Sequence, residues 1–288
     1  MKDLYGVAGI SRQALHQQRI REQSRDQKSQ EFFDNADKIR KEHPGCGCRK
    51  MARQLPCRGW GRDKVEQLLL NSGYRVFYRR RFKKTTDHRR EFYYPNLIEG
   101  MELNDMNQVV QTDITYYRIG EQFYYLTFLI DVYSRRIVGH AVSKSLHAQA
   151  NIRALTKMLQ LRGNQVKQLI HHSDRGSQYV SQEYRKLLSD HGIRSSMCLA
   201  GWENAYTERI NRTIKEEYLD YWQISDYRSL SYRLTKAVNH YNNKRAHNSL
   251  NGHTPVEFEK HVNNLPLQHR PKHVIYKHQE TCSQKICE

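Results

Sequence analysis

Three acidic residues stand in segments that otherwise have the composition of regular structure. Asp113 lies in the run QVVQTDITYY, residues 108–117, whose β-branched and aromatic residues predict a strand buried on at least one face. Asp174 follows a second apolar run in HHSDRGSQY, and Glu208 lies in ENAYTERINRTIK, which predicts a helix. A single aspartate can end a strand by bonding to its own backbone. Three acids from three elements instead indicate a metal site.

Three carboxylates within a few ångströms repel one another by roughly 4 kcal/mol per close pair at an effective dielectric near 20, so they need a cation. Oxygen ligands select hard ions, which predicts Mg²⁺ (or Mn²⁺), as two ions about 3.5 to 4 Å apart. Such a site activates a water or a DNA 3′ hydroxyl for in-line attack on a phosphodiester and stabilises the leaving 3′ oxygen. No covalent protein intermediate is required, so no serine or tyrosine receives a nucleophilic role.

Neighbouring residues offer further candidates. Glu208, Arg212 and Lys215 are spaced to share one helix face, where the basic pair would contact DNA phosphate or, alternatively, form an ordinary surface ion pair. Glu203 at the helix start complements the helix dipole, and Glu216 and Glu217 lie about 12 Å further along the axis, so Glu208 is the predicted third ligand. The residues interpreted as structural are His171 and His172 at a buried strand end and Asp131 in a turn.

The composition indicates an anionic partner. The 288 residues include 48 Lys and Arg against 30 Asp and Glu, a formal charge of +18, which favours a polyanion such as DNA. No stretch approaches the roughly 18 apolar residues of a membrane span and no signal peptide opens the sequence, so we expect a cytoplasmic, nucleoid-associated protein. The six cysteines show no disulfide framework, and zinc binding by His43, Cys46, Cys48 and Cys57 is disfavoured by their spacing.

The N-terminal part predicts helices and a basic stretch. We expect an N-terminal arm over residues 1–35, either helical or frayed, a small all-α helix-turn-helix-like segment over 36–78 and a basic linker over 79–104. The last helix, residues 62–72, exposes Arg62 and Lys64 and could enter a DNA groove, although an ordinary three-helix bundle would show the same pattern. The run YRVFYRRRFKKTTDHRR adds Arg79, Arg80 and Arg81 among aromatic residues, which favours contact with DNA.

From residue 105 to 265 the hydrophobic pattern alternates between strand-like and helix-like segments, which is typical of an α/β domain. Strand patterns at 108–117, 122–131 and 135–143 predict an antiparallel meander. After the meander we expect, in order, a helix at 148–161, a strand at 167–172, a helix capped by Ser181, a strand at 193–197 and the helix with Glu208. Further helices are expected at 226–245 and from Thr254. This order predicts a mixed sheet with flanking helices. The tail from 266 to 288 is basic and is expected to be irregular.

These motifs carry a family resemblance. The acids on the first strand, after the fourth strand and on the following helix resemble the ribonuclease-H-like core of retroviral integrases and DDE transposases. The segments TDITYY, LIDVYSRRIVGH, HSDRGSQYVS, NAYTERINRTIKEE and YNNKRAHNSLNGHTP, with HPGCGCRKMARQL upstream, resemble the insertion-sequence-three family of bacterial transposases, second reading-frame product, over residues 36–262. The spacing departs slightly, because 33 residues separate Asp174 from Glu208, two fewer than is usual in that family.

The resemblance implies a DDE transposase that binds the terminal inverted repeats of its element through residues 36–90 and cleaves and joins DNA strands. It implies a homo-oligomer on DNA and a possible fusion, by frameshifting, with an upstream helix-turn-helix protein. It supports Lys215 as a DNA contact, and Arg245 and His247 as supports of the core or of DNA. The alternatives are a non-catalytic DNA-binding regulator derived from a transposase and, third, a nuclease for RNA/DNA hybrids.

Overall fold

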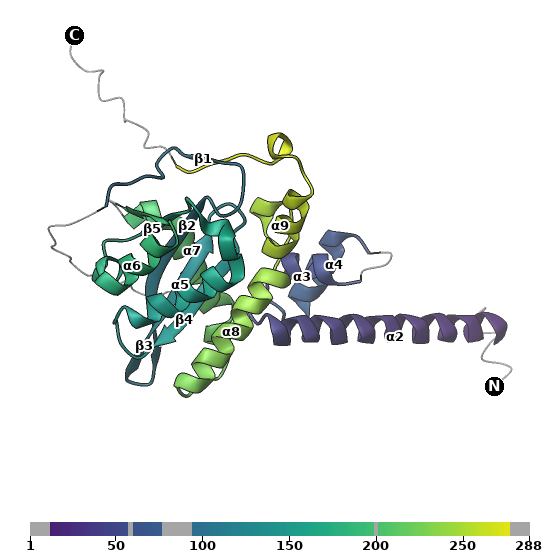
Figure 1. Cartoon of the computed structure of the whole chain (residues 1–288). Helices are drawn as coiled ribbons and strands as arrows, with labels where there is room; N and C mark the ends of the chain where they lie inside the picture. Colours follow the sequence, from purple (N-terminus) through teal and green to yellow (C-terminus); the bar gives the residue numbers. More distant parts are fainter. Residues whose placement is uncertain (1–11, 57–59, 77–93, 199–200, 277–288) are drawn as a thin grey trace, which may run out of the picture. The chain divides into compact units, whose positions relative to one another are not determined.

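The computed structural model describes residues 12–56, 60–76, 94–198 and 201–276, which belong to two compact units, Met1–Arg79 and Arg80–Glu288. Each unit has its own hydrophobic core. Figure 1 shows the helices and strands of the chain. Within the described residues, none of the helices has the length and apolar character needed to cross a membrane.

The first unit contains three helices, α2 (Arg12–Glu42), α3 (Cys48–Gln54) and α4 (Arg62–Asn71). Their core gathers apolar side chains from all three, among them Phe32, Met51 and Leu69. Of the two alternatives for the N-terminal segment, the structure shows the helix from Arg12 onward, because α2 runs unbroken to Glu42 and its residue Phe32 is part of this core. Residues 12–30 are polar but contain no proline or glycine, so they do not interrupt the helix.

The second unit is built on a five-stranded mixed sheet with strand order β4-β3-β2-β5-β6. Strands β2 and β3 and strands β3 and β4 pair antiparallel, whereas β5 pairs parallel with both β2 and β6. The bounds are β2 Val109–Ile119, β3 Gln122–Asp131, β4 Ile137–Ser143, β5 Ile170–Ser173 and β6 Arg194–Met197. The predicted meander and mixed sheet are therefore confirmed.

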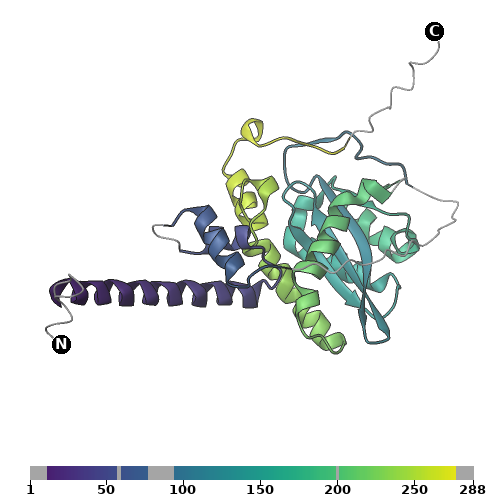
Figure 2. The same cartoon turned by 180° about the vertical axis from the view of Figure 1, so that it is seen from behind.

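Helices cover both faces of this sheet. Helices α5 (Gln149–Arg162) and α6 (Gln182–Asp190) pack on one face, and α7 (Ala205–Glu217) and α8 (Tyr227–Asn243) pack on the other (Figures 1 and 2). Helix α9 (Pro255–Asn263) follows, and short 3-10 helices lie at Gly163–Val166, Ser177–Val180, Gly201–Asn204, Leu219–Tyr221, Asn248–Leu250 and Leu267–His269. The predicted α/β class with flanking helices is confirmed.

Helix α5 lies unusually close to β4. A Cβ atom at Gly139 in β4 would stand 2.2 Å from the backbone oxygen of Ala154 in α5, so a residue with any side chain would force the helix away. The buried residues Leu155 and Met158 then fill the space between the helix and the sheet. Glycine at position 139 thus fixes how closely this layer packs.

Two short strands add a part of the fold that was not predicted. Strand β1 (Glu102–Leu103) pairs antiparallel with β7 (His273–Val274), although the sequence placed these residues in a linker and an irregular tail. Ile98, Leu103 and Ile275 are fully buried in a third core cluster. Two-residue strands are too short to produce a readable alternation, which explains why the pattern missed them.

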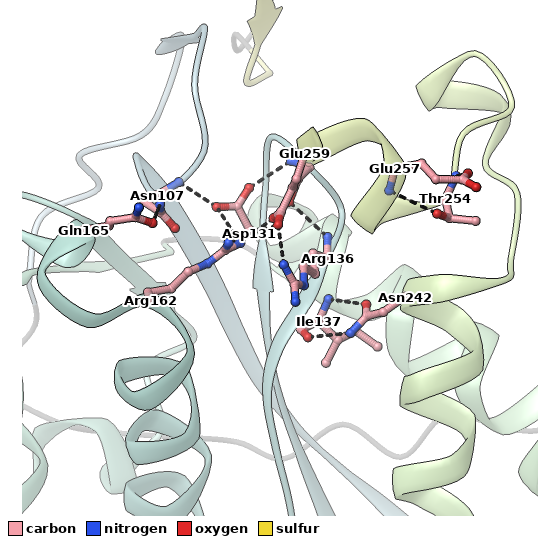
Figure 3. A network of polar contacts seen from close by, with 11 residues as sticks. Asn107, Asp131, Arg136, Ile137, Arg162, Gln165, Asn242, Thr254, Glu257 and Glu259 are labelled. Carbon is pink, nitrogen blue, oxygen red and sulfur yellow. Dashed lines mark hydrogen bonds and ion pairs between the residues drawn. The ribbon is translucent and has the colours of Figure 1, made fainter. Parts of the chain in front are cut away.

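A buried ionic network fixes α9 to the sheet (Figure 3). Glu259 of α9 pairs with Arg162 at the end of α5 and with Arg136 between β3 and β4. Asp131 accepts hydrogen bonds from the backbone nitrogens of Ser134 and Asn107, as a turn residue does, and its carboxylate also lies 4.0 Å from Arg162. The interpretation of Asp131 as structural is therefore supported, with a larger role than a turn.

Candidate active site

Asp113 lies in the middle of β2, directly past the last residue of β2 that pairs with β5. Its Oδ1 accepts the backbone N–H of Ile114 at 2.8 Å, and its Oδ2 accepts the Nδ2 amide of Asn211 at 2.7 Å. Burial raises its pKa, the charges of Asp174 and Glu208 raise it further, and the two hydrogen bonds only partly oppose them, so the pKa is about 7. The protein surrounds this carboxyl group but leaves it some contact with solvent.

Asp174 follows β5 at the neighbouring strand end. Its Oδ1 accepts the backbone N–H of Gly176 at 3.1 Å, and a Cβ atom at position 176 would stand 2.9 Å from that same oxygen. The glycine in the motif Asp-Arg-Gly therefore allows the carboxylate to fold back over the loop backbone. Arg175, between them, donates to the carbonyl oxygen of Cys198 after β6 at 3.2 Å, which ties the loop to the next strand.

Glu208 lies in the first turn of α7 and is exposed. The beginning of α7 is attached to β2, because Asn204 donates to the carbonyl oxygen of Thr112 at 3.0 Å and Gln111 donates to the carbonyl oxygen of Glu203 at 3.0 Å. Glu203 itself is 4% exposed, on the 3-10 turn before α7. Of these two glutamates, Glu208 has the charge that contributes to the raised pKa of Asp113.

The three carboxylates are electrostatic neighbours that do not form a closed ligand shell. Among the residues that the structure describes, no three His, Cys, Asp or Glu side chains are gathered closely enough to hold a metal ion. The donors nevertheless suit a hard divalent cation, because all of them are carboxylate oxygens and a cation would relieve the like-charge repulsion that raises the pKa of Asp113.

Comparison with known proteins identifies the family. Residues 104–201 and 194–255 match the integrase core domain. The chain is 31% identical over 224 residues to the transposase for insertion sequence element IS629 from Shigella sonnei, covering 76% of this chain and 75% of that protein. The chain belongs to the IS3-type transposases. It is also 30% identical over 219 residues to an uncharacterized 31 kDa protein of insertion element IS600 from Shigella sonnei, covering 74% of this chain and 80% of that protein.

Further relatives include the transposase InsF for insertion sequence IS3A from Escherichia coli (strain K12), 34% identical over 161 residues and covering 53% of this chain and 54% of that protein. Among solved structures, the transposase is similar to the catalytic core domain of HTLV-2 integrase in complex with magnesium, with 22% identity, a TM-score of 0.44, and coverage of 57% of this chain and 99% of that chain. The predicted family resemblance is confirmed by the sequence matches.

The basic residues predicted on α7 of the transposase have different surroundings. Lys215 is half-buried and donates from Nζ to Thr115 Oγ1 at 2.7 Å, two residues along β2 from Asp113. Arg212 is exposed and forms its surface ion pair with Glu216 at 2.9 Å, one turn further from the acids than the predicted partner Glu208. Lys215 thus contacts the strand that carries Asp113.

The other carboxylate considered on α7 has a structural partner. Arg245 binds Glu217 with two hydrogen bonds, at 2.7 and 2.8 Å, in a buried pair that ties α7 to the segment after α8. The ring of His247 lies edge-on to Tyr241, and one Arg245 nitrogen approaches it at 3.3 Å. Arg245 and His247 therefore support the core, as one of the two predictions for them stated.

Both histidines before Asp174 are structural. His171 contacts the Tyr184 hydroxyl through Nε2 at 2.8 Å, and His172 contacts Ser196 Oγ through Nδ1 at 2.9 Å. Burial lowers the pKa of His171 to about 3, with His172 adding to the effect, and lowers that of His172 to about 4, so both rings are neutral at physiological pH. These contacts fix the end of β5 from which Asp174 emerges.

The predicted contacts of the first unit remain predictions. Arg62 pairs with its neighbour Asp63 at 3.2 Å, and the Lys64 ammonium lies 5.9 Å from the Trp60 ring centroid, both on the exposed side of α4. Cys46 and Cys48 are reduced and buried in the core of that unit. Four residues named in the sequence analysis lie outside the described ranges: Cys57, Arg79, Arg80 and Arg81.

Asn211 is the site residue that sequence reasoning missed. It is buried, and its amide bonds Asp113 from a position 98 residues away in the chain. It lies three residues after Glu208 on the same helix, so its i, i+3 spacing placed it on the acid-bearing face. That spacing was the available signal.

Proposed function

We propose that this transposase catalyses metal-dependent DNA strand cleavage and strand transfer at the terminal inverted repeats of its insertion sequence, with Asp113, Asp174 and Glu208 as the catalytic carboxylates. The observation that carries the proposal is the electrostatic coupling of these acids, because Asp174 and Glu208 both raise the pKa of the enclosed Asp113 carboxyl. Each of the three comes from a different element. A structural role alone gives no reason to bring three acids together.

The carboxylates would hold Mg²⁺ or Mn²⁺, as two ions. When bound, the ions supply activation of a water or a DNA 3′ hydroxyl and stabilisation of the leaving 3′ oxygen. Asn211 and the backbone N–H of Ile114 hold the two oxygens of Asp113 in a fixed orientation. Gly176 lets the Asp174 carboxylate fold back over its own loop, and the ammonium group of Lys215 bonds Thr115 of β2, the strand of Asp113, where it can contact a phosphate.

The remaining contacts with DNA are assigned by charge and position. Arg212 lies one turn after Glu208 on α7 and is exposed, so it can exchange Glu216 for a phosphate. The first unit and the basic run after it, with Arg62, Lys64, Arg79, Arg80 and Arg81, would bind the terminal inverted repeats. Assembly as a homo-oligomer on DNA and joining to an upstream helix-turn-helix protein are part of the same proposal, by analogy with the family.

A strand-cleavage assay tests the proposal. The substrates are end-labelled duplexes that carry the two ends of the insertion sequence encoding this chain, with scrambled-end duplexes as the control. Cleavage should require Mg²⁺ or Mn²⁺, stop with excess chelator and return when either ion is added, whereas Ca²⁺ should support binding without turnover. Cleavage that persists in excess chelator would contradict the role of the carboxylates.

A further inference from the structure

One edge of the sheet is free of acidic residues over a long stretch of structure. Residues 132–173 and 227–256 contain no Asp or Glu, and they include all of β4, α5 and α8. At the chain's overall frequency of 30 acids in 288 residues, stretches of this combined length would carry about seven. The same stretches carry many lysines and arginines, so this side of the unit is strongly positive.

Helices α5 and α8 both contact strand β4, which is one of the two edge strands of the sheet. The carbonyl oxygen of Val142 in β4 accepts hydrogen bonds from Arg153 of α5 at 3.0 Å and from the Tyr227 hydroxyl of α8 at 3.1 Å. Lys144, just after β4, lies 5.5 Å from the Tyr227 ring centroid. In Figure 1, β4 runs between α5 and α8. We define the β4-edge surface by Lys144, Arg153, Lys157, Arg233 and Lys236.

The five cations have no acidic partner among the residues that the structure describes. Lys144, Arg153 and Lys157 are exposed. Arg233 and Lys236 are half-buried, and their charged groups lie 5.3 and 5.7 Å from the Trp222 ring centroid. By contrast, Arg136 and Arg162 from the same acid-free stretch are neutralised by Glu259. The β4-edge surface therefore carries uncompensated positive charge.

Titration of the neighbouring groups agrees with a positive potential. Burial lowers the pKa of Lys157, and the charge of Arg153 lowers it further. His140, on β4, has its pKa lowered to about 4 by burial and by Lys157, so the ring is neutral. An anion at this edge would relieve the repulsion between Lys157 and Arg153.

Strand β4, beside the β4-edge surface, lies two strands from the β2 residue Asp113 in the plane of the sheet. Asp113 of β2 pairs with Phe128 of β3, and Phe128 pairs with His140 of β4. Two strand spacings of roughly 4.8 Å separate Asp113 from β4, so the distance between the two backbones is about 10 Å. That is less than the roughly 12 Å width of a DNA major groove. A DNA duplex bound at the carboxylates would therefore have β4 within its width.

We propose that the β4-edge surface binds the sugar-phosphate backbone of duplex DNA, as a second contact beside the catalytic carboxylates. The inference rests on the proposed function, since it assumes that DNA is the substrate. Lysines at a sheet edge also prevent strand-to-strand association, but that role does not require acids to be absent from both adjoining helices. In a second copy bound to this surface across a two-fold axis, the same acid-free patch would face itself, so cations would be brought near cations.

The experiment measures how DNA affinity depends on salt. The test variant replaces Arg153, Lys157, Arg233 and Lys236 by glutamine. The matched control replaces Lys167, Arg185, Lys186 and Arg194, four exposed cations around α6 and β6, by glutamine, which removes the same charge elsewhere on the unit. Binding of a fluorescent duplex is followed between 50 and 200 mM salt, in Ca²⁺ so that no strand is cleaved.

The test variant should lower the slope of log affinity against log salt by up to about four, and the control should leave it nearly unchanged. Equal slopes in the two variants would overturn the inference, as would a changed sedimentation coefficient with an unchanged slope, which would assign the surface to self-association. The pairs Arg153/Lys157 and Arg233/Lys236 are also replaced separately, because Arg233 and Lys236 make no bond to the sheet backbone. Each pair should account for up to about two.

The proposed function is tested in the same preparation by cleavage of the repeat duplex in Mg²⁺. If the wild type cleaves the repeat and the test variant shows the control's slope, the second contact is wrong and the proposed function stands. If the wild type neither binds nor cleaves repeat DNA, the proposed function fails and the β4-edge surface loses its partner with it.

Discussion

Replacing Glu259 by glutamine should strongly destabilise the second unit. The Glu259 side chain is buried, and its carboxylate binds Arg162 through both oxygens, Arg136 through one, and the hydroxyl of Ser134 at 2.8 Å (Figure 3). Glutamine removes the charge and leaves two guanidinium groups with only Asp131, 4.0 Å from Arg162, as a described acidic neighbour. Removing one partner of a buried ion pair costs about 3–5 kcal/mol. For a unit of this size that loss lowers the melting temperature by about 6–20 °C.

The assay is urea unfolding of the full chain followed by circular dichroism, with Glu257→Gln as the matched control. Glu257 lies two residues earlier on α9, is exposed and closes the capping box with Thr254, a role that glutamine can also fill. The control should therefore change the free energy of unfolding by less than about 0.5 kcal/mol. An equal effect of the two substitutions would refute the reasoning about the network.

Wild type and Glu259→Gln, compared at several pH values, test how the network's contribution to stability depends on pH. Burial opposes ionisation of Glu259, but the hydrogen bonds and charges of Arg162 and Arg136 outweigh it and hold its pKa below the ordinary 4.5. The contribution of the charge is therefore complete above pH 4.5 and is lost as the pH falls through the lower folded-state pKa. The stability difference between wild type and Glu259→Gln should shrink in acid and persist at pH 7.

Three further predictions concern the site and DNA. The pKa of Asp113 is raised from 3.8 to about 7, so the stability linked to its proton is full below pH 3.8 and is lost as the pH rises through 7. Metal-free Asp113→Asn should therefore be more stable than wild type at pH 8, by up to about 4 kcal/mol. Mg²⁺ should raise the melting temperature of the wild type and leave that of the variant unchanged. Asn211→Ala removes the 2.7 Å bond to Asp113, worth about 1.5–3 kcal/mol, and should slow cleavage roughly 10- to 150-fold while moving the acid limb of the pH–rate profile upward. Replacing Arg79, Arg80 and Arg81 together by alanine should lower the salt slope of duplex binding by up to about three, and an unchanged slope would remove that segment from the interface.

The sequence predicted the main elements because their packing is periodic. Strand β3 was predicted at 122–131 and is observed at Gln122–Asp131. Its side chains point alternately to the two faces of the sheet, and residues 126–131 are all buried because helices cover both faces. Helix α5 was predicted at 148–161 and is observed at Gln149–Arg162. The acids were found for a related reason, because a carboxylate next to an apolar strand is conspicuous in a sequence.

What the sequence could not predict are contacts between segments far apart in the chain. Asn211 bonds Asp113 across 98 residues, and Glu259 binds Arg162 across 97. Before the fold is known, each of these residues reads as an ordinary polar position on a helix. Arg212 shows the opposite problem, because helical spacing allowed Glu208 or Glu216 as its partner and only the structure distinguishes them.

The assignment of Glu208 as the third carboxylate is tested most directly by strand cleavage with matched glutamine variants. Glu208 is exposed in the first turn of α7, and its charge raises the pKa of Asp113, whereas Glu203 is buried on the preceding turn. Replacing either one by glutamine is the same chemical change, and the two positions are five residues apart. With end-labelled repeat DNA and Mg²⁺, Glu208→Gln should abolish cleavage and strand transfer while it leaves DNA binding and folding intact, and Glu203→Gln should keep substantial activity. A dead Glu203 variant beside an active Glu208 variant would contradict the proposed active site.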